Sequence, residues 1–267
     1  MSHPVIFSFF HFFIFLFLFA SCGEKSPTAA ERREAQFESW RQQLATERNT
    51  LHVTDSLLSA LIPRINEATT KQGFEYERNE CDDLGRFRPK GMDPGQNVQR
   101  TYLRSAVDDY GRTQLIAQYC GPRSFVVEQL RLEASDGTSV TTLCITPNDG
   151  SNYSYDIDGI HYQAVTFAYA GRIIEGMTQD HTVLTTADTD GGALAFIAQH
   201  ADDERLVCHL ISAQGREQRL TIPARERRSL AATYELGVLL RESLRLQQEN
   251  KTASLKISYL EQKIEYH

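Results

Sequence analysis

Apolar residues in the first third of the chain recur at alternating spacings of three and four. They follow one heptad track whose only polar members are Glu47 and Thr54. The apolar members are Phe37, Trp40, Leu44, Leu51, Leu58, Leu61, Ile65 and Ala68. A track sustained over about five heptads predicts a helix with a coiled-coil seam, here over 31–73. Pro63 lacks a backbone donor, so we expect the helix to kink there or to end near Ile62.

The last part of the chain, 223–267, has the same kind of pattern. Pro223 suits a first helical turn, and a 4-3 spacing then continues without a break through Ala232, Leu236, Leu239, Ser243, Leu246, Asn250, Ala253, Ile257, Leu260 and Ile264. One Asn in a seam often fixes the register of a coiled coil at some cost in stability. A helix of about 42 residues would extend roughly 60 Å, too far to be buried against one small domain. The two long helices are therefore expected to form a coiled-coil-like stalk, either as an antiparallel pair within the chain or by pairing with a second protein chain.

Between the helices, over 74–222, the period changes to two. Asp-Gly dipeptides typical of hairpin turns occur at 136–137, 149–150, 158–159 and 190–191. Strands are predicted near 100–107, 113–120, 125–134, 139–146, 151–157, 160–170, 181–187, 193–200, 205–213 and 217–222. No helical pattern of ten residues separates them, so the fold class is α+β, with a mostly antiparallel β meander folded as a sandwich or partial barrel.

The hairpin around Asp158-Gly159 has a register that can be read from the sequence. A two-residue loop places apolar and aromatic pairs on one side: Ile157 with Ile160, Tyr155 with Tyr162, and Tyr153 with Ala164. The other side pairs Asp156 with His161 and Ser154 with Gln163, and it is expected to face solvent.

The chain begins with a stretch that carries no charged residue from Val5 to Ala20. Eight of the 14 Phe precede Cys22. The stretch is shorter than the roughly 20 residues that a membrane-spanning helix needs, and it is typical of the apolar core of a secretory signal.

The four residues Phe19-Ala20-Ser21-Cys22 resemble the lipobox of bacterial lipoproteins. The resemblance covers about 22 residues, with Phe19 where the family usually has Leu and no Lys or Arg in the leading region. It implies a signal peptide over 1–21 and a lipidated tether over 22–30. In that family the Cys thiol receives diacylglycerol and the new amine is acylated, with chains such as palmitate. A plain signal peptide and an uncleaved anchor helix are the alternatives.

The resemblance also implies a location. Two or more acyl chains make membrane anchoring stable, so a lipidated Cys22 would hold the protein in the bacterial cell envelope. Gly23 is not the Asp by which enteric-type lipoproteins are retained at the inner membrane, which favours the outer membrane. The overall layout is similar to that of uncharacterised lipoproteins of Bacteroidetes-type bacteria.

Charge is distributed unevenly along the chain. The segment 80–222 holds 20 Asp and Glu against 12 Lys and Arg, whereas the rest of the chain is balanced. An acidic middle and the lack of a block of basic residues argue against a nucleic-acid partner.

Apart from Cys22, the chain holds Cys81, Cys120, Cys144 and Cys208. None has metal-ligand or C-x-x-C spacing. Four cysteines allow three pairings, and two interpretations stay open: buried free thiols, or one disulfide among Cys120, Cys144 and Cys208.

The sequence contains no H-E-x-x-H, G-x-S-x-G, P-loop or G-x-G-x-x-G motif. No cofactor and no metal site is predicted. The turn at Asp188-Thr189-Asp190 could supply carboxylates to Ca²⁺, but position 199 holds Gln199 where an EF-hand needs Glu. Turn chemistry explains these aspartates, and those at 156–158, without a metal.

Other candidate groups have equally simple structural explanations. His200 with the acidic run 202–204 reads as a turn, and His161 with Asp156 as a cross-strand pair, while His52 and His209 are isolated. Tyr155 and Tyr162 could stack on a sugar ring, although core packing explains them as well. Together with Asp188 and Asp190, they are the ligand-binding candidates that the sequence offers.

The leading hypothesis is therefore a membrane-anchored, non-enzymatic lipoprotein that serves as an interaction or structural module of the envelope. A lipoprotein that binds a glycan or a cation and assists uptake is the alternative. A third class is an envelope hydrolase, which requires a pocket joining His161, His200 or His209 to carboxylates.

Overall fold

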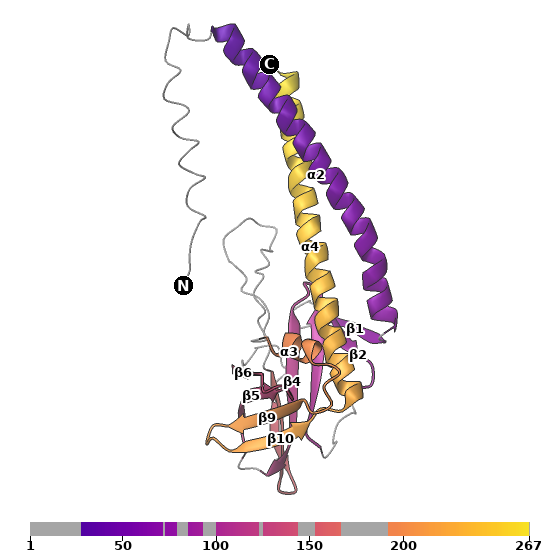
Figure 1. The fold of residues 1–267 in the computed structure, drawn as a ribbon, viewed down its shortest axis with the longest axis vertical. Coiled ribbons are helices and arrows are strands. Elements are labelled where there is room, and N and C mark those ends of the chain that lie inside the picture. The colour runs from indigo at the N-terminus through magenta and orange to yellow at the C-terminus, as the bar shows by residue number, and fades with distance from the viewer. Residues whose placement is uncertain are drawn as a thin grey trace, which may run out of the picture. The chain divides into compact units, whose positions relative to one another are not determined.

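The computed structural model describes residues 28–71, 73–78, 85–92, 100–122, 125–143, 153–166 and 192–266. Figure 1 shows the elements of the chain, which divides into two compact units. One comprises Met1–Asn49 and Ser254–His267, and the other comprises Thr50–Ala253. Because each long helix crosses a boundary, both helices contribute residues to both units.

The elements follow the order helix, strands, short helix, strands, helix. They are α2 (Ala29–Lys71), β1 (Phe74–Arg78), β2 (Gly85–Pro89), β3 (Tyr102–Asp108), β4 (Thr113–Pro122), β5 (Val127–Glu133), β6 (Ser139–Leu143), β7 (Tyr153–Ile157), β8 (Ile160–Thr166), α3 (Ala193–Gln199), β9 (Val207–Ser212), β10 (Glu217–Thr221) and α4 (Ala224–Glu265). The α+β class and the two long terminal helices are confirmed.

The strands form two antiparallel sheets rather than one continuous meander. The six-stranded sheet has the order β1-β2-β3-β4-β8-β7, and the four-stranded sheet has the order β10-β9-β5-β6. The chain leaves the first sheet after β4, builds β5 and β6 in the second, and returns with β7 and β8. Turn signals mark where strands end, but they do not say which sheet the next strand joins.

One strand prediction was wrong, and one pair of strands was missed. The strand expected over 193–200 is the helix α3, in which Ala193, Leu194 and Ile197 are fully buried. A short apolar run fits a buried strand and a buried helix equally well, so periodicity alone could not decide. The pair β1 and β2 was not predicted, and the strand expected over 181–187 lies outside the described residues.

The helix α2 continues through Pro63, so of the two expectations for this position, a kink or an end near Ile62, the end was wrong. Pro63 removes one backbone hydrogen bond. On either side of it, Leu61 is 5% exposed and Ile65 is half-buried. Packing of the seam on both sides of the proline therefore outweighs the loss of one bond.

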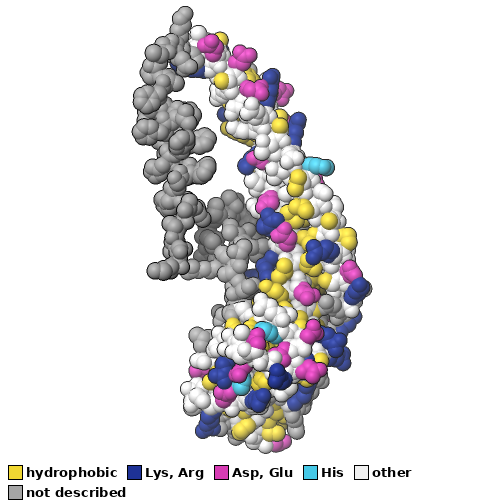
Figure 2. Space-filling view, in the orientation of Figure 1, with side chains coloured by type: hydrophobic (Ala, Val, Ile, Leu, Met, Phe, Trp, Pro, Cys, Tyr) yellow, Lys and Arg dark blue, Asp and Glu magenta, His cyan; other side chains and the backbone are white. Residues whose placement is uncertain are grey.

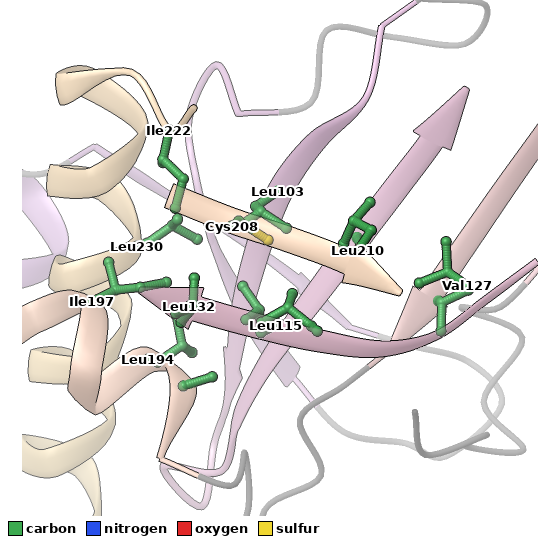
Figure 3. Close-up of a cluster of buried hydrophobic side chains, with 14 of the residues drawn as sticks. Leu103, Leu115, Val127, Leu132, Leu194, Ile197, Cys208, Leu210, Ile222 and Leu230 are labelled. Atoms are coloured by element: carbon green, nitrogen blue, oxygen red, sulfur yellow. The ribbon is translucent and has the colours of Figure 1, made fainter. Parts of the chain in front are cut away.

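One hydrophobic core joins both sheets, α3 and the start of α4. Figure 3 shows Leu103 and Leu115 of the first sheet facing Leu132, Cys208 and Leu210 of the second. Leu194, Ile197, Ile222 and Leu230 close the same cluster from the helical side. Each of these nine side chains is completely buried.

The helix α4 contacts the six-stranded sheet at β3 and at the turn between β3 and β4. Ser105 and Thr233 share a buried hydrogen bond of 2.7 Å, and Nη1 of Arg241 donates to the carbonyl oxygen of Gly111 over 2.6 Å. A Cβ atom built on Gly111 would lie 2.5 Å from the carbonyl oxygen of Gly237. The two backbones therefore approach more closely than any side chain at Gly111 would allow.

Within each unit, the contacts between α2 and α4 run antiparallel. In the larger unit, Nδ2 of Asn250 donates to Oγ1 of Thr54 over 3.2 Å and to Oδ1 of Asp55 over 2.6 Å. In the smaller unit, Nζ of Lys256 donates to Glu47 over 2.8 Å, and Nζ of Lys263 lies 5.4 Å from the ring centroid of Trp40. Thr54 and Asn250, polar members of the two heptad tracks, thus pair with each other.

We expect Asn250→Leu to make the helix pairing more stable but less specific. The change removes the bonds that select Thr54 and adds apolar surface to the seam, and a buried polar residue trades stability for register. Thermal unfolding should shift upward, and light scattering should reveal species larger than those of the parent. Gln248→Leu, at an exposed position of the same helix, is the matched control. A variant with the parent's melting temperature and size would contradict the role given to Asn250.

Candidate functional site

The hairpin of β7 and β8 holds most of the candidate residues that the structure describes. Its register is the predicted one: Tyr153 pairs with Ala164, Tyr155 with Tyr162, Asp156 with His161, and Ile157 with Ile160. The loop residues Asp158 and Gly159 both have positive φ, 48° and 83°. Two consecutive left-handed residues are what a two-residue hairpin turn requires.

Tyr155 and Tyr162 stack on each other. Their ring centroids are 5.2 Å apart and the rings are inclined by 17°. Tyr162 is 6% exposed, whereas Tyr155 is 37% exposed. Of the two tyrosines predicted to bind a ligand, only Tyr155 therefore offers substantial surface, and Tyr162 supports it from within the protein.

The opposite side of the hairpin was expected to face solvent, but it does so only in part. His161 and Gln163 on β8 are 7% and 9% exposed. Oε1 of Gln163 accepts a hydrogen bond of 3.1 Å from the backbone N–H of Val127. Val165, on the same side of β8, belongs to the hydrophobic core. This side of β8 therefore packs toward the core, whereas Ser154 and Asp156 on β7 remain exposed.

Ser154, His161 and Asp156 form a line of hydrogen bonds on this side. Nδ1 of His161 lies 3.1 Å from Oδ1 of Asp156, and Nε2 lies 3.3 Å from Oγ of Ser154. An ionised carboxylate only accepts, so in a neutral imidazole Nδ1 donates to Asp156 and Nε2 accepts from the hydroxyl of Ser154. Hydroxyl, imidazole and carboxylate stand in the order that activates a serine nucleophile.

The other histidines lie elsewhere and hold different partners. His209 on β9 lies between Glu133 and Glu217, with Nε2 3.6 Å from Oε2 of Glu133. His200 follows α3, with its ring centroid 4.5 Å from that of Phe196 and the rings inclined by 46°, and His52 is exposed on α2. The structure therefore does not bring His161, His200 and His209 into one site.

The acidic run after His200 serves as a turn. Oδ2 of Asp203 accepts from the N–H of Ser135 over 2.6 Å, and Oδ1 accepts from the N–H of Arg205 over 2.9 Å. These backbone hydrogen bonds hold the pKa of the Asp203 carboxyl below its ordinary value. Among the residues described, no group of three or more His, Cys, Asp and Glu side chains has a geometry that could hold a metal ion.

Several candidates lie outside the described residues: Cys22, Asp188, Asp190, and the cysteines Cys81 and Cys144. Cys120 and Cys208 carry free thiols. Burial raises the pKa of both thiols, most strongly that of the fully buried Cys208. Neither is therefore a ready nucleophile near neutral pH.

A hollow beside the first turns of α4 was not predicted from the sequence. It measures about 630 Å³ and is lined by Pro89, Ala201, Arg225, Arg228, Ser229, Ala231, Ala232 and Glu235. The arginine-rich start of the helix was visible in the sequence. The walls come from β2 and from the turn after α3, and only the tertiary fold brings them there.

Surface charge elsewhere is mixed in sign. On the face shown in Figure 2, acidic and basic side chains alternate over the long helices and over the strands. None of the described helices contains a stretch apolar and long enough to cross a membrane.

Comparison with known proteins gives no family for the chain. No protein-family model matches it, and neither a curated protein nor a solved structure is significantly similar to it. What the fold defines is a class alone: an α+β protein with two antiparallel sheets and long helices at both ends of the described chain.

Proposed function

We propose that the protein is a lipoprotein of the bacterial envelope, anchored through acylated Cys22 and serving as a non-enzymatic interaction or structural module. The observation that carries the proposal is the uncharged, Phe-rich leader that ends at Phe19-Ala20-Ser21-Cys22. Such a leader directs export, and acylation then supplies the anchor. The outer membrane is the favoured location because Gly23 follows the cysteine.

The long helices support a role as a coiled-coil-like stalk in this proposal. Their contacts within each unit follow heptad spacing along α2, at Trp40, Glu47 and Thr54. An antiparallel pair of this kind is a stiff spacer. Exposed apolar side chains such as Leu255 and Tyr259 on α4 leave room in the same proposal for a second protein chain.

We expect Cys22→Ala to move the protein from the membrane fraction to the soluble fraction. Two or three acyl chains hold a protein on a bilayer, and the variant has none. The measurement is membrane fractionation of cells, with intact-mass analysis of the purified parent to detect the added lipid. Cys120→Ala is the control and should remain with the membrane. A Cys22→Ala protein that still sediments with membranes, or a parent without acyl groups, would reject the anchor.

Ligand binding is the second candidate function, and the hollow beside α4 is the observation that favours it. The residues Tyr155, Tyr162, Asp188 and Asp190 remain its sequence-based candidates for a glycan or a cation. A binding lipoprotein and an interaction module differ only in the size of the occupant. Lipid anchoring through Cys22 is common to both.

The line Ser154–His161–Asp156 allows a direct test of the non-enzymatic proposal. If the line serves structure only, a serine-reactive fluorophosphonate should label the protein no faster than the Ser154→Ala variant. Mass spectrometry of the labelled protein reads out the adduct. His161→Gln is the control for a labelling reaction that depends on the imidazole. Labelling of Ser154 that is lost in both variants would show an activated serine and replace the proposal with the hydrolase class.

A further inference from the structure

We propose that the hollow beside α4 binds the free C-terminal carboxylate of a short peptide that has small apolar side chains. This inference rests on the proposed role as a binding or interaction module and gives that role a ligand class. It does not depend on the lipid anchor. Its basis is a cavity with a cationic end, a floor of small side chains and an acceptor at the far end.

The cationic end consists of Arg225 and Arg228. Both are exposed, and neither forms an ion pair with a carboxylate in the described part of the chain. Glu226, which lies between them in sequence, is already paired with Nη1 of Arg100 at 3.0 Å. Two guanidinium groups without a carboxylate present a planar, multidentate site that suits a carboxylate better than a point charge would.

One wall holds the Arg225 guanidinium close to the backbone. A Cβ atom built on Gly91 would lie 3.0 Å from Nη2 of Arg225, so the guanidinium group rests beside the end of β2. Arg228 is oriented differently, since its Nε donates to the carbonyl oxygen of Ala224 over 3.3 Å. Because that bond uses only Nε, the terminal nitrogens of Arg228 can still donate to a ligand.

The floor is apolar and made of small side chains. Ala231 and Ala232 are 6% and 4% exposed, and Pro89 and Ala201 complete the lining. Arg227 holds Ala201 in place. Its Nε donates to the carbonyl oxygen of Ala201 over 3.0 Å, and its Nη1 donates to the carbonyl oxygen of Ile222 over 2.7 Å. Arg227 is 4% exposed, so its side chain belongs to the folded interior. The hollow is therefore formed before any ligand binds.

The dimensions suit a peptide of about three residues. A volume of about 630 Å³ lies within the range of roughly 300–1,000 Å³ typical of small-molecule sites. Glu235 follows Arg228 by seven residues, which is about 10 Å along a helix at 1.5 Å per residue. An extended peptide covers the same distance in about three residues.

The far end selects a peptide over a fatty acid. The carboxylate of Glu235 and the hydroxyl of Ser229 line the hollow together with the arginines. A peptide offers N–H groups along its length, so one of them can donate to Glu235 while the terminal carboxylate binds the arginines. The hydrocarbon tail of a fatty acid has no donor, so it would not form this hydrogen bond with the exposed Glu235.

Calorimetric titration of the full-length protein in detergent tests the inference with two probes. N-acetyl-Ala-Ala-Ala carries a free carboxylate, and its C-terminal amide has the same size without the charge. We expect the acid to bind at least tenfold more tightly than the amide. The double variant Arg225→Gln with Arg228→Gln should bind the acid at least tenfold more weakly, with unchanged circular dichroism because both side chains are exposed. Arg219→Gln, an exposed arginine on β10, should bind as the parent does.

Three outcomes would overturn the inference: equal affinity for acid and amide, unaltered binding by the double variant, or no binding of the acid at millimolar concentration. A loss in Arg219→Gln as large as that in the double variant would also overturn it, because binding would then follow net charge alone. Cys22→Ala should bind the acid normally. If the parent protein is membrane-bound but does not bind the peptide as expected, only this inference is rejected. If the Cys22→Ala protein remains membrane-bound but binds the peptide, only the lipid anchor is rejected.

Discussion

Replacing Gly111 by alanine is expected to lower the free energy of unfolding by about 2–5 kcal/mol, the sum of left-handed backbone strain of about 1–2 kcal/mol and overpacking of about 1–3 kcal/mol. Gly111 has a φ of +73°. The added methyl group would lie 2.5 Å from the carbonyl oxygen of Gly237 and 2.8 Å from the backbone nitrogen of Arg241. Both neighbours are backbone atoms of α4, so relief requires the helix to move away from the sheet. Urea unfolding followed by circular dichroism measures the change.

Gly137→Ala separates the two causes. Gly137 has a φ of +84°, and a Cβ atom built there has no neighbour within 4 Å. It therefore carries the strain without the collision, and the expected loss is only about 1–2 kcal/mol. Equal losses at both glycines would show that backbone strain alone explains the effect. The close approach of the β3–β4 turn to α4 would then contribute nothing to stability.

Replacing Leu210 by alanine is expected to cost about 3 kcal/mol, within the range of about 2–5 kcal/mol for truncating a buried leucine. Leu210 is completely buried on β9 and faces the cluster that joins both sheets and the helices (Figure 3). The pairing strands on both sides hold its backbone in place, so the site cannot collapse around the lost methyl groups. Because the core is shared, one cooperative transition of the larger unit should shift to lower denaturant concentration.

Leu255→Ala is the matched control on an exposed surface. Leu255 is 64% exposed on α4, and alanine has the higher helix propensity. The expected change is within about 0.5 kcal/mol, as for most surface substitutions. A loss at Leu255 comparable with that at Leu210 would mean that another surface covers it in solution. A small loss at Leu210 would mean that the core is packed less tightly than its burial indicates.

Much of the fold was predictable from local pattern. The heptad tracks predicted α2 and α4 because each helix buries one stripe, and the polar residues Thr54 and Asn250 interrupted the stripes at positions that meet. The Asp158-Gly159 turn fixed the register of its hairpin because a two-residue loop permits only one alignment. In these elements, short-range geometry and burial agree.

The misses share a cause, which is that burial is decided by tertiary neighbours. His161 and Gln163 alternate with Tyr162 as an exposed row would, yet residues 161–165 of β8 are buried on both faces of the sheet. The apolar run of α3 carries no period long enough to identify a helix. Pro63 does not end α2, because Leu61 is buried and Ile65 is half-buried on either side of it, and their packing offsets the lost backbone hydrogen bond.

The candidate site was the least predictable part. Ser154, Asp156 and His161 could be placed on one side of a hairpin, since they alternate at period two. The hollow beside α4 could not be predicted, because Pro89 and Ala201 reach Arg225 and Arg228 only through the folding of the sheets and the turn after α3.

The smaller unit joins the start of α2 to the end of α4, with Lys263 against Trp40 and Glu261 bound to Arg48 at 2.7 Å. A fluorescent label or affinity tag placed after Tyr266 would thus lie near the N-terminal part of α2. Such a reporter would follow the environment of the N-terminal helix. Antibody access to it in intact cells would reveal how crowded that neighbourhood is.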